Sequence, residues 1–237
     1  MLYLKDGLAF YRGNLRSVSL HQHHAVELIV SEQPCEFWQD DIRLHRGRVA
    51  LLGADVPHRF VGNGWQWFVY AEPESCLGLS LAHRLNGQPV MSLPDTLTTH
   101  LPIGEATSTG KLLLLLESLI QALNPVESLS MATTLDWRID RVLLHVKEHI
   151  TDRLPIDQLT EVACLSEGRL IHLFKEQIGI PIRKYILWTR LQVAVEHVVS
   201  GQNLTQAAHS GGFADSAHFS RTFSDMFGIR PSDVLVK

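Results

Sequence analysis

The sequence lacks a long hydrophobic run, and it contains few cysteines. Its run of consecutive leucines, Leu112–Leu116, ends at Glu117 and is far shorter than the roughly 20 apolar residues of a membrane helix. The three cysteines, Cys35, Cys76 and Cys164, are too few and too widely spaced for a disulfide framework. The first residues also lack the basic start and long apolar stretch of a secretion signal. These absences predict a cytoplasmic protein without a membrane partner.

A strong charge of either sign is also missing. The formal net charge is −4 at pH 7, which by itself argues mildly against nucleic acid as a partner. Residues 138–237 hold 12 Lys and Arg against 11 Asp and Glu, whereas residues 1–137 hold 9 against 14. Because the C-terminal part is only weakly basic, a DNA-binding function has to be argued from motifs and geometry.

Residues 1–85 have the pattern of an all-β domain. Short tracts rich in β-branched or aromatic residues occur at Val26–Val30, Val49–Leu52 and Trp65–Tyr70, and turn formers separate them. Several short strands with this spacing predict a compact barrel or sandwich.

A loop and one leucine-rich helix follow at residues 86–125. Prolines and glycines dominate the first part, and the unbroken stretch Lys111–Leu123 then ends at Asn124-Pro125. Its leucines cover more than one stripe of a helix, so we expect burial on two sides. One side is expected against the β domain, and the other either within the same monomer or against a second subunit in a homodimer. Residues 126–137 show no periodicity and form the expected linker.

The last hundred residues contain an internal repeat, which is the most specific signal in the chain. Phe174 and Phe223 are 49 residues apart, and so are Gly179 and Gly228. Each copy has a short amphipathic helix, at 159–163 or 204–208, followed by a tight turn and a longer helix. This order of elements is typical of a helix-turn-helix, whose second helix lies in the major groove of DNA. Ser166 and Asp215 are the expected caps of the two longer helices.

The second copy carries an ordered set of residues: Gly212, Phe213, Asp215, Phe219, Ser220, Arg221, Phe223, Gly228 and Pro231. With this set, residues 138–237 resemble the DNA-binding domain of AraC/XylS-type transcription regulators. The resemblance implies two helix-turn-helix units joined by one long helix, here at Ile182–Ser200, that read successive major grooves of promoter or operator DNA. RNA polymerase is a further candidate partner, and the sequence leaves open whether the protein is an activator or a repressor. Cys164 and Thr160 replace a turn glycine and a helix alanine of the family, so the first unit is expected to be slightly distorted.

Helical phase separates the residues expected to face DNA from those expected to face the core. The outward set in the first unit is Glu167, Arg169, Ile171, His172 and Lys175, and in the second unit it is Ser216, Ala217, His218, Ser220 and Arg221. Arg221 is the strongest candidate for reading a base, because a guanidinium can bond guanine O6 and N7 together. Lys175 and Arg183 are expected to contact phosphates. The competing interpretation of each is a solvated surface residue.

The segment HQHHAVE at residues 21–27 carries the other candidate site. On a strand, His21, His23 and Glu27 share one face, whereas His24 points to the opposite face. Together with His58, these residues offer imidazole and carboxylate ligands to a divalent metal. The alternative is that the same histidines line a pocket for a small-molecule effector or are hydrogen-bonded at a barrel mouth. The sequence leaves both interpretations open.

The spacing of this segment resembles the HxHx3E motif of cupin barrels, although a glycine after Glu27 and an asparagine after His58 are missing. It is also similar to the ligand-sensing barrel common in AraC-type regulators. The resemblance implies a cupin-like sensor domain. The alternative function is a metal-dependent cupin-type enzyme with an accessory helical domain. We expect no enzyme, because the sequence has no phosphate-binding glycine loop and no GxSxG motif.

The sequence therefore predicts a multidomain chain. Residues 1–85 form a cupin-like all-β barrel, residues 86–125 a loop and a connecting or dimerisation helix, and residues 126–137 a linker. Residues 138–237 form an all-α domain with two helix-turn-helix units. The predicted function is transcription regulation through DNA binding, under the control of a small-molecule or metal effector.

Overall fold

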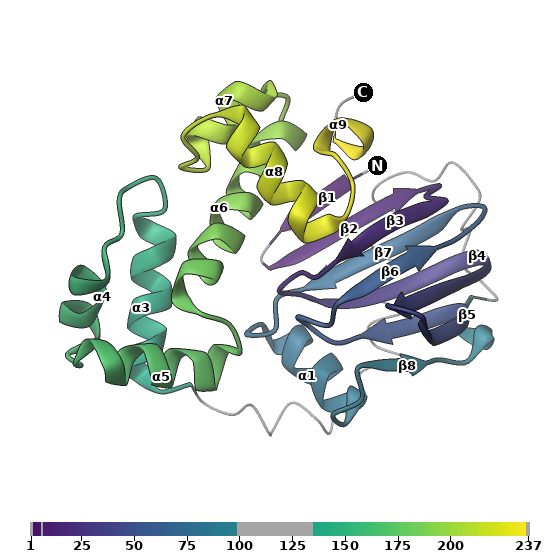
Figure 1. Ribbon diagram of the computed structural model, residues 1–237, viewed down its shortest axis with the longest axis horizontal. Helices are drawn as coiled ribbons and strands as arrows, with labels where there is room; N and C mark the ends of the chain where they lie inside the picture. The colour runs from purple at the N-terminus through teal and green to yellow at the C-terminus, as the bar shows by residue number, and fades with distance from the viewer. Residues whose placement is uncertain (1, 6, 99–134, 236–237) are drawn as a thin grey trace. The chain divides into compact units, whose positions relative to one another are not determined.

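A computed structural model describes residues 2–5, 7–98 and 135–235 of the chain (Figure 1). These residues form two compact units, one built on a β-sheet and one built of helices. The predicted fold class, an all-β domain followed by an all-α domain, is confirmed. The expected helix at 111–123, and with it the expected dimer contact, lies outside the described residues.

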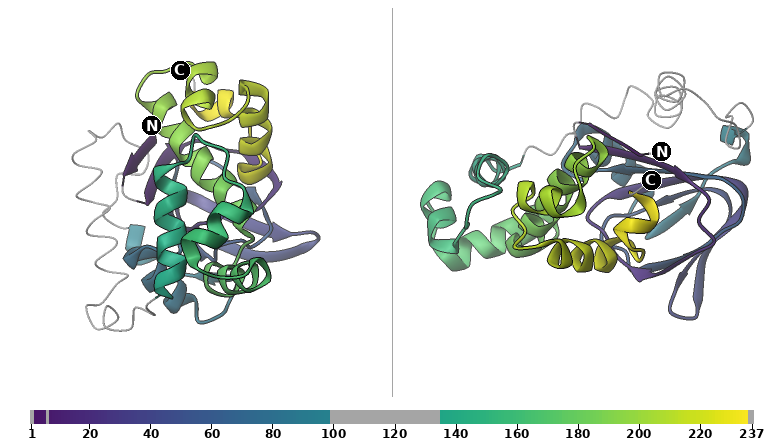
Figure 2. Two further views of the ribbon diagram at one scale, coloured as in Figure 1. Left: turned by 90° about the vertical axis from the view of Figure 1, so that its left-hand side faces the viewer. Right: turned by 90° about the horizontal axis from the view of Figure 1, so that it is seen from above.

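The N-terminal unit is an eight-stranded sheet with antiparallel pairs. Its strands are β1 (Leu2–Lys5), β2 (Leu8–Gly13), β3 (Ser17–His21), β4 (Val26–Gln39), β5 (Ile42–Leu52), β6 (His58–Val61), β7 (Gln66–Ala71) and β8 (Val90–Ser92). The order is β1-β2-β7-β4-β5-β8, and β6 pairs with both β3 and β4. The strands curve strongly, as the right-hand view of Figure 2 shows.

Strand β4 organises this sheet because its two halves have different neighbours. The first half pairs with β7, the second half pairs with β6, and β5 runs along both. The register with β5 shifts between Val30 and Cys35, and such an irregularity bends a strand. Leu28 and Ile29 point to opposite faces, yet both are buried, in two separate clusters. The centre of the sheet is therefore covered on both faces.

One face is covered by a helix that the sequence analysis did not predict. Helix α1 (Cys76–Leu85) begins at Ser75, whose side chain accepts a hydrogen bond from the Gly78 backbone N–H. Its residues Leu81 and Leu85 pack into the cluster around Leu28. The sheet also extends past residue 85, since β8 pairs with β5, and a short 3-10 helix (Asp95–Thr98) follows it.

The C-terminal unit consists of helices that match the predicted repeat. They are α3 (Trp137–Glu148), α4 (Ile156–Ala163), α5 (Glu167–Ile178), α6 (Ile182–Val199), α7 (Leu204–Ser210), α8 (Ser216–Phe227) and α9 (Pro231–Val234). Helices α4 and α5 form the first helix-turn-helix, and α7 and α8 form the second. Helix α6 contacts α5 and α7 and runs between the two helix-turn-helix units (Figure 2). Among the described helices, none has the length and apolar character to cross a bilayer.

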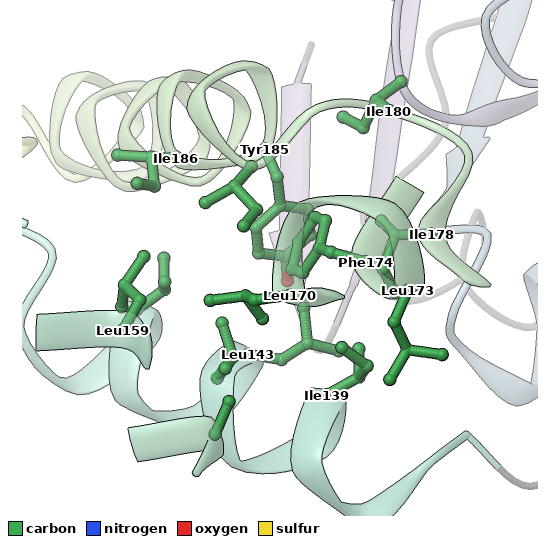
Figure 3. Packing of buried hydrophobic residues seen from close by; sticks show 14 of the residues in the cluster. Ile139, Leu143, Leu159, Leu170, Leu173, Phe174, Ile178, Ile180, Tyr185 and Ile186 are labelled. Carbon is green, nitrogen blue, oxygen red and sulfur yellow. The ribbon is translucent and has the colours of Figure 1, made fainter. Parts of the chain in front are cut away.

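The first helix-turn-helix closes over a hydrophobic core (Figure 3). Leu143 from α3, Leu159 from α4 and Leu170 from α5 converge there. The ring of Phe174 is fully buried and lies 5.6 Å from the ring of Tyr185, at 70°. Because one residue from each helix contributes to the same cluster, the packing fixes α5 relative to α3, α4 and α6.

The turns of the two copies differ in the residue that adopts the left-handed conformation. Gly212 has φ +74° in the second turn, whereas Cys164 has φ +50° at the matching position of the first. The caps differ as well. The Asp215 carboxylate accepts a hydrogen bond from the His218 backbone N–H at 2.6 Å, as expected. Ser166 is the N-cap of α5, but its side chain makes no capping hydrogen bond, so the prediction of a side-chain cap there is wrong.

Candidate functional site

The first candidate surface is the outer face of α5. The residues predicted to point outward are all exposed: Glu167, Arg169, Ile171, His172 and Lys175. Leu170, Leu173 and Phe174, which alternate with them, are buried. Ile171 has 45% of its surface exposed, although an isoleucine is ordinarily buried. The helical phase of α5 is thus as predicted, and contact of this face with DNA stays a prediction.

The second candidate surface is the outer face of α8, and its residues are not equally available. Ala217 and Arg221 are exposed, whereas Ser216, His218 and Ser220 are half-buried. The Ser220 hydroxyl donates to the Ser216 carbonyl at 2.7 Å. The His218 ring lies 5.2 Å from the ring of Phe213, edge to face. Arg221 therefore stands out as the exposed charged residue of the predicted set on α8.

A partly buried arginine joins helix α6 to the loop between α3 and α4. Arg190 donates from Nε to the Ile150 carbonyl at 3.1 Å and from a terminal nitrogen to the Asp152 carbonyl at 2.7 Å. These hydrogen bonds join α6 to the loop between α3 and α4. Burial lowers the pKa of Arg190, but a guanidinium stays charged in a protein. Arg190 is therefore a structural residue here, not a candidate for DNA contact.

The third candidate site is a cluster of three buried histidines in the sheet unit. One ring nitrogen from each of His21, His23 and His58 lies within 4.8 Å of the others. The ring centroids of His21 and His58 are 4.1 Å apart, and those of His23 and His58 are 5.3 Å apart. The structure thus brings together the three histidines that the sequence analysis singled out.

His21 and His23 do not lie on one continuous strand, contrary to the prediction from the sequence. Strand β3 ends at His21 and β4 begins at Val26, so residues 22–25 are not in a strand. His21 and His58 meet because they are paired residues of β3 and β6. The backbone carbonyl of His23 accepts a hydrogen bond from the Asp55 N–H at 2.9 Å. The histidines are therefore brought together by backbone pairing between residues 21–23 and residues 55–58, and not by alternation of side chains along one strand.

Hydrogen bonds to the backbone orient two of the three rings. Nδ1 of His21 lies 2.7 Å from the Ser19 carbonyl oxygen, and Nδ1 of His58 lies 2.9 Å from the Val56 carbonyl oxygen. A carbonyl only accepts, so both Nδ1 atoms carry the proton and both Nε2 atoms carry a lone pair. Burial lowers the pKa of each ring to about 3, and that of His23 to about 4. All three rings are therefore neutral near pH 7.

Glu27 lies beside this cluster. Its Oε2 atom is 3.2 Å from His23 Nε2 and 3.6 Å from His58 Nε2. Burial raises the pKa of Glu27 to about 7, against the lowering effect of His58. Across the β4–β7 pair, Glu27 faces Tyr70, whose ring lies 5.1 Å from that of His23. No local sequence pattern marks Tyr70 as a residue of this site, and only the strand register reveals it.

His24 belongs to a separate set of contacts, as expected, although it lies in a loop and not on a strand. Its Nδ1 lies 2.8 Å from an Asp55 carboxylate oxygen, and its Nε2 lies 2.7 Å from a Glu74 carboxylate oxygen. Burial alone would lower the pKa of His24, but these two carboxylates raise it to about 9. His24 is thus a charged ring with both nitrogens hydrogen-bonded, in contrast to the three neutral rings of the cluster.

Comparison with known proteins agrees with this geometry. Residues 159–236 match a protein family described as a helix-turn-helix domain. The chain is 31% identical over 98 residues, 40% of each chain, to a probable transcriptional regulator, LumQ, of Photobacterium leiognathi. It is 28% identical to the arabinose operon regulatory protein of Salmonella typhimurium over 121 residues. This alignment covers 50% of this chain and 43% of that protein. The aligned part thus spans about two fifths of these relatives' length.

A solved structure matches over nearly the whole chain. ToxT from Vibrio cholerae superposes with a TM-score of 0.60 over 95% of this chain and 96% of that chain, at 15% sequence identity. At this identity the likeness concerns the fold, and it includes both the sheet unit and the helical unit. The tandem helix-turn-helix repeat and these matches make the helical unit similar to the helix-turn-helix domain family, and they make the fold of the chain similar to that of ToxT.

Proposed function

We propose that the protein is a transcription regulator that binds specific sequences in double-stranded DNA through its helical unit and an effector through its sheet unit. The observation that carries the proposal is the second helix of each helix-turn-helix. In both α5 and α8, the inner face is buried in a core and the outer face presents side chains to solvent. Such a helix fits the major groove of DNA.

The roles of the exposed residues follow from their chemistry. Arg221 is placed to form two hydrogen bonds with a guanine edge. Lys175 at the end of α5 and Arg183 at the start of α6 are exposed cations that suit phosphate contacts. Ser220 and His218 contribute less than the sequence alone predicts, because their side chains already contact Ser216 and Phe213.

A binding experiment on the full chain tests this function. The preferred duplex is first selected from a random pool, and affinity is then measured by fluorescence anisotropy at one fixed salt concentration. We expect Arg221→Ala to weaken binding to the selected duplex about 5- to 150-fold, the range of one lost bidentate base contact. Binding to a scrambled duplex should fall much less. Arg16→Ala is the matched control, because it removes one exposed charge from the sheet unit.

Two results would contradict the proposal. Equal losses on the selected and scrambled duplexes would make Arg221 a phosphate contact instead of a base contact. If no duplex is enriched even at low salt, DNA binding itself is wrong, and the alternative of a metal-dependent cupin-type enzyme gains support. Contact with RNA polymerase and formation of a homodimer stay predictions.

The effector part of the proposal is supported by the fold of the sheet unit. ToxT, which has a similar fold, has been solved with an unsaturated fatty acid bound. In the present chain, three buried histidines of the sheet unit lie together, and Nδ1 of His23 has no hydrogen-bond partner. We therefore assign effector binding to the region of β3 and β6 that holds them.

A further inference from the structure

We propose that His21, His23 and His58, with Glu27 beside them, bind one divalent transition-metal ion, and that this ion is the effector of the protein. The metal site stands on the geometry of the sheet unit alone. Its regulatory role rests on the proposed function.

The spacing of the candidate ligand atoms fits one ion. Zinc binds imidazole nitrogens at about 2.0–2.1 Å, which places two ligands of a tetrahedral site roughly 3.3 Å apart. The three histidines each have a nitrogen within 4.8 Å of the others. The Glu27 oxygen is 3.2 Å from His23 Nε2 and 3.6 Å from His58 Nε2. Small side-chain rotations are therefore sufficient to bring three nitrogens and one oxygen around an ion.

The hydrogen bonds of the rings prepare the site for a cation. Each backbone carbonyl that accepts from a Nδ1–H leaves a Nε2 lone pair on His21 and His58. Within the described part of the chain, no hydrogen-bond donor reaches either Nε2 atom. A metal-binding histidine ordinarily has this arrangement, with its other ring N–H donated to a carbonyl or carboxylate. The backbone thus fixes the tautomer that a metal requires.

The cluster contains buried polar atoms, and one of them has no hydrogen-bond partner. His23 Nδ1 is buried without a hydrogen-bond partner, and Glu27 is 2% exposed. Buried polar atoms without partners are costly, so most are satisfied by protein, water or an ion. His24, by comparison, has both ring nitrogens on carboxylates. A cation at the centre of the cluster would satisfy the lone pairs of three rings and one carboxylate together.

The ligand types indicate the class of metal. Imidazole nitrogens with one carboxylate suit zinc, iron, cobalt, nickel or copper. Calcium and magnesium prefer sites made of oxygen atoms. The choice among these first-row metals depends on their availability, so zinc and cobalt are used as probes.

The test uses the untagged full chain after treatment with a chelator. Zn²⁺ or Co²⁺ is titrated alone, and bound metal is measured by calorimetry and elemental analysis. We expect one ion per chain, and at least tenfold weaker binding in His21→Gln and His58→Gln, since even supporting residues of metal sites change affinity by about 10–100-fold. His45→Gln is the matched control, because His45 is also a buried histidine of the sheet unit but contacts Ser92.

The cobalt spectrum of the unmutated protein keeps the proposal testable if a variant fails to fold. Visible absorption bands of Co²⁺ bound by nitrogen and oxygen ligands are the expected result. The proposal is wrong if the unmutated protein binds neither ion at micromolar concentration, or if folded His58→Gln binds as tightly as the unmutated protein.

The regulatory role is tested by repeating the DNA-binding measurement with and without Zn²⁺. We expect a change of at least fivefold in affinity for the selected duplex, absent in His58→Gln, because a coupled effector changes affinity by about 5- to 150-fold. Metal binding without any change in DNA affinity would overturn the effector role. If the chain binds metal but no DNA, the proposed function fails while the metal site holds, so the two failures are distinguishable.

Discussion

Replacing Cys164 with glycine should stabilise the helical unit. Cys164 ends α4 with φ +50° and ψ +44°, and its backbone N–H donates to the Glu161 carbonyl at 3.1 Å. The left-handed conformation costs a residue with a Cβ atom about 1–2 kcal/mol. Glycine avoids this cost but makes the unfolded chain more flexible, which costs about 0.4–1 kcal/mol. The exposed Cys164 thiol has a weak contact, a 3.5 Å approach to the Glu161 carbonyl, so little else is lost.

The net gain in the free energy of unfolding is therefore about 0.5–1 kcal/mol. With a urea dependence of about 2 kcal/mol per molar, the midpoint should rise by roughly 0.3–0.5 M. Circular dichroism at 222 nm follows this transition, since most described helices belong to the helical unit.

The control is Cys164→Ser, which keeps a side chain of similar size in the same conformation. Its urea midpoint should stay close to that of the unmutated protein. A glycine variant that is no more stable than the serine variant would refute the argument, because the conformational cost would then not be present in the folded protein.

Three further predictions concern the same unit and use the same urea measurement. Gly211→Ala should destabilise by about 1–3 kcal/mol, because a Cβ atom there would lie 2.6 Å from the Arg190 carbonyl oxygen and 2.8 Å from Ala194 Cβ; an unchanged midpoint would contradict the close approach of α6 and α7. Arg190→Met should lower the free energy of unfolding by about 1–3 kcal/mol, because two hydrogen bonds from a charged donor to backbone carbonyls are lost. Loss of DNA binding at unchanged stability would instead make Arg190 a DNA contact. Asn203→Ala should cost about 1 kcal/mol, because the Asn203 side chain accepts from the Gln206 backbone N–H at 3.0 Å in a capping box; Asn203→Ser should retain most of that stability.

Two elements of the sheet unit, helix α1 and strand β8, were not predicted from the sequence and differ in the strength of their local signals. Helix α1 is preceded by Ser75, a favoured N-cap residue, and Leu77, Leu81 and Leu85 follow at a spacing of four. These are the ordinary marks of a helix. Strand β8 carries a weaker signal, because a three-residue strand is too short for any periodicity to show.

The sequence by itself determined the helical unit. Its helices, their inward and outward faces and their turns depend on residues that are close in the chain, such as the three- and four-residue spacing around Phe174 and the glycines at 179 and 228. Local interactions of this kind can be read from one segment at a time. The repeat of 49 residues then made the assignment specific.

Only the tertiary structure decided how the histidine cluster is built and which α8 side chains are available. His21 and His58 are 37 positions apart and meet through the register of β3 and β6, which no local pattern specifies. The two carbonyls that fix the ring tautomers and the contact of His218 with Phe213 depend in the same way on the folded backbone. The sequence specifies the chemistry of each side chain, whereas the distances between side chains on separate segments are set only when the chain folds.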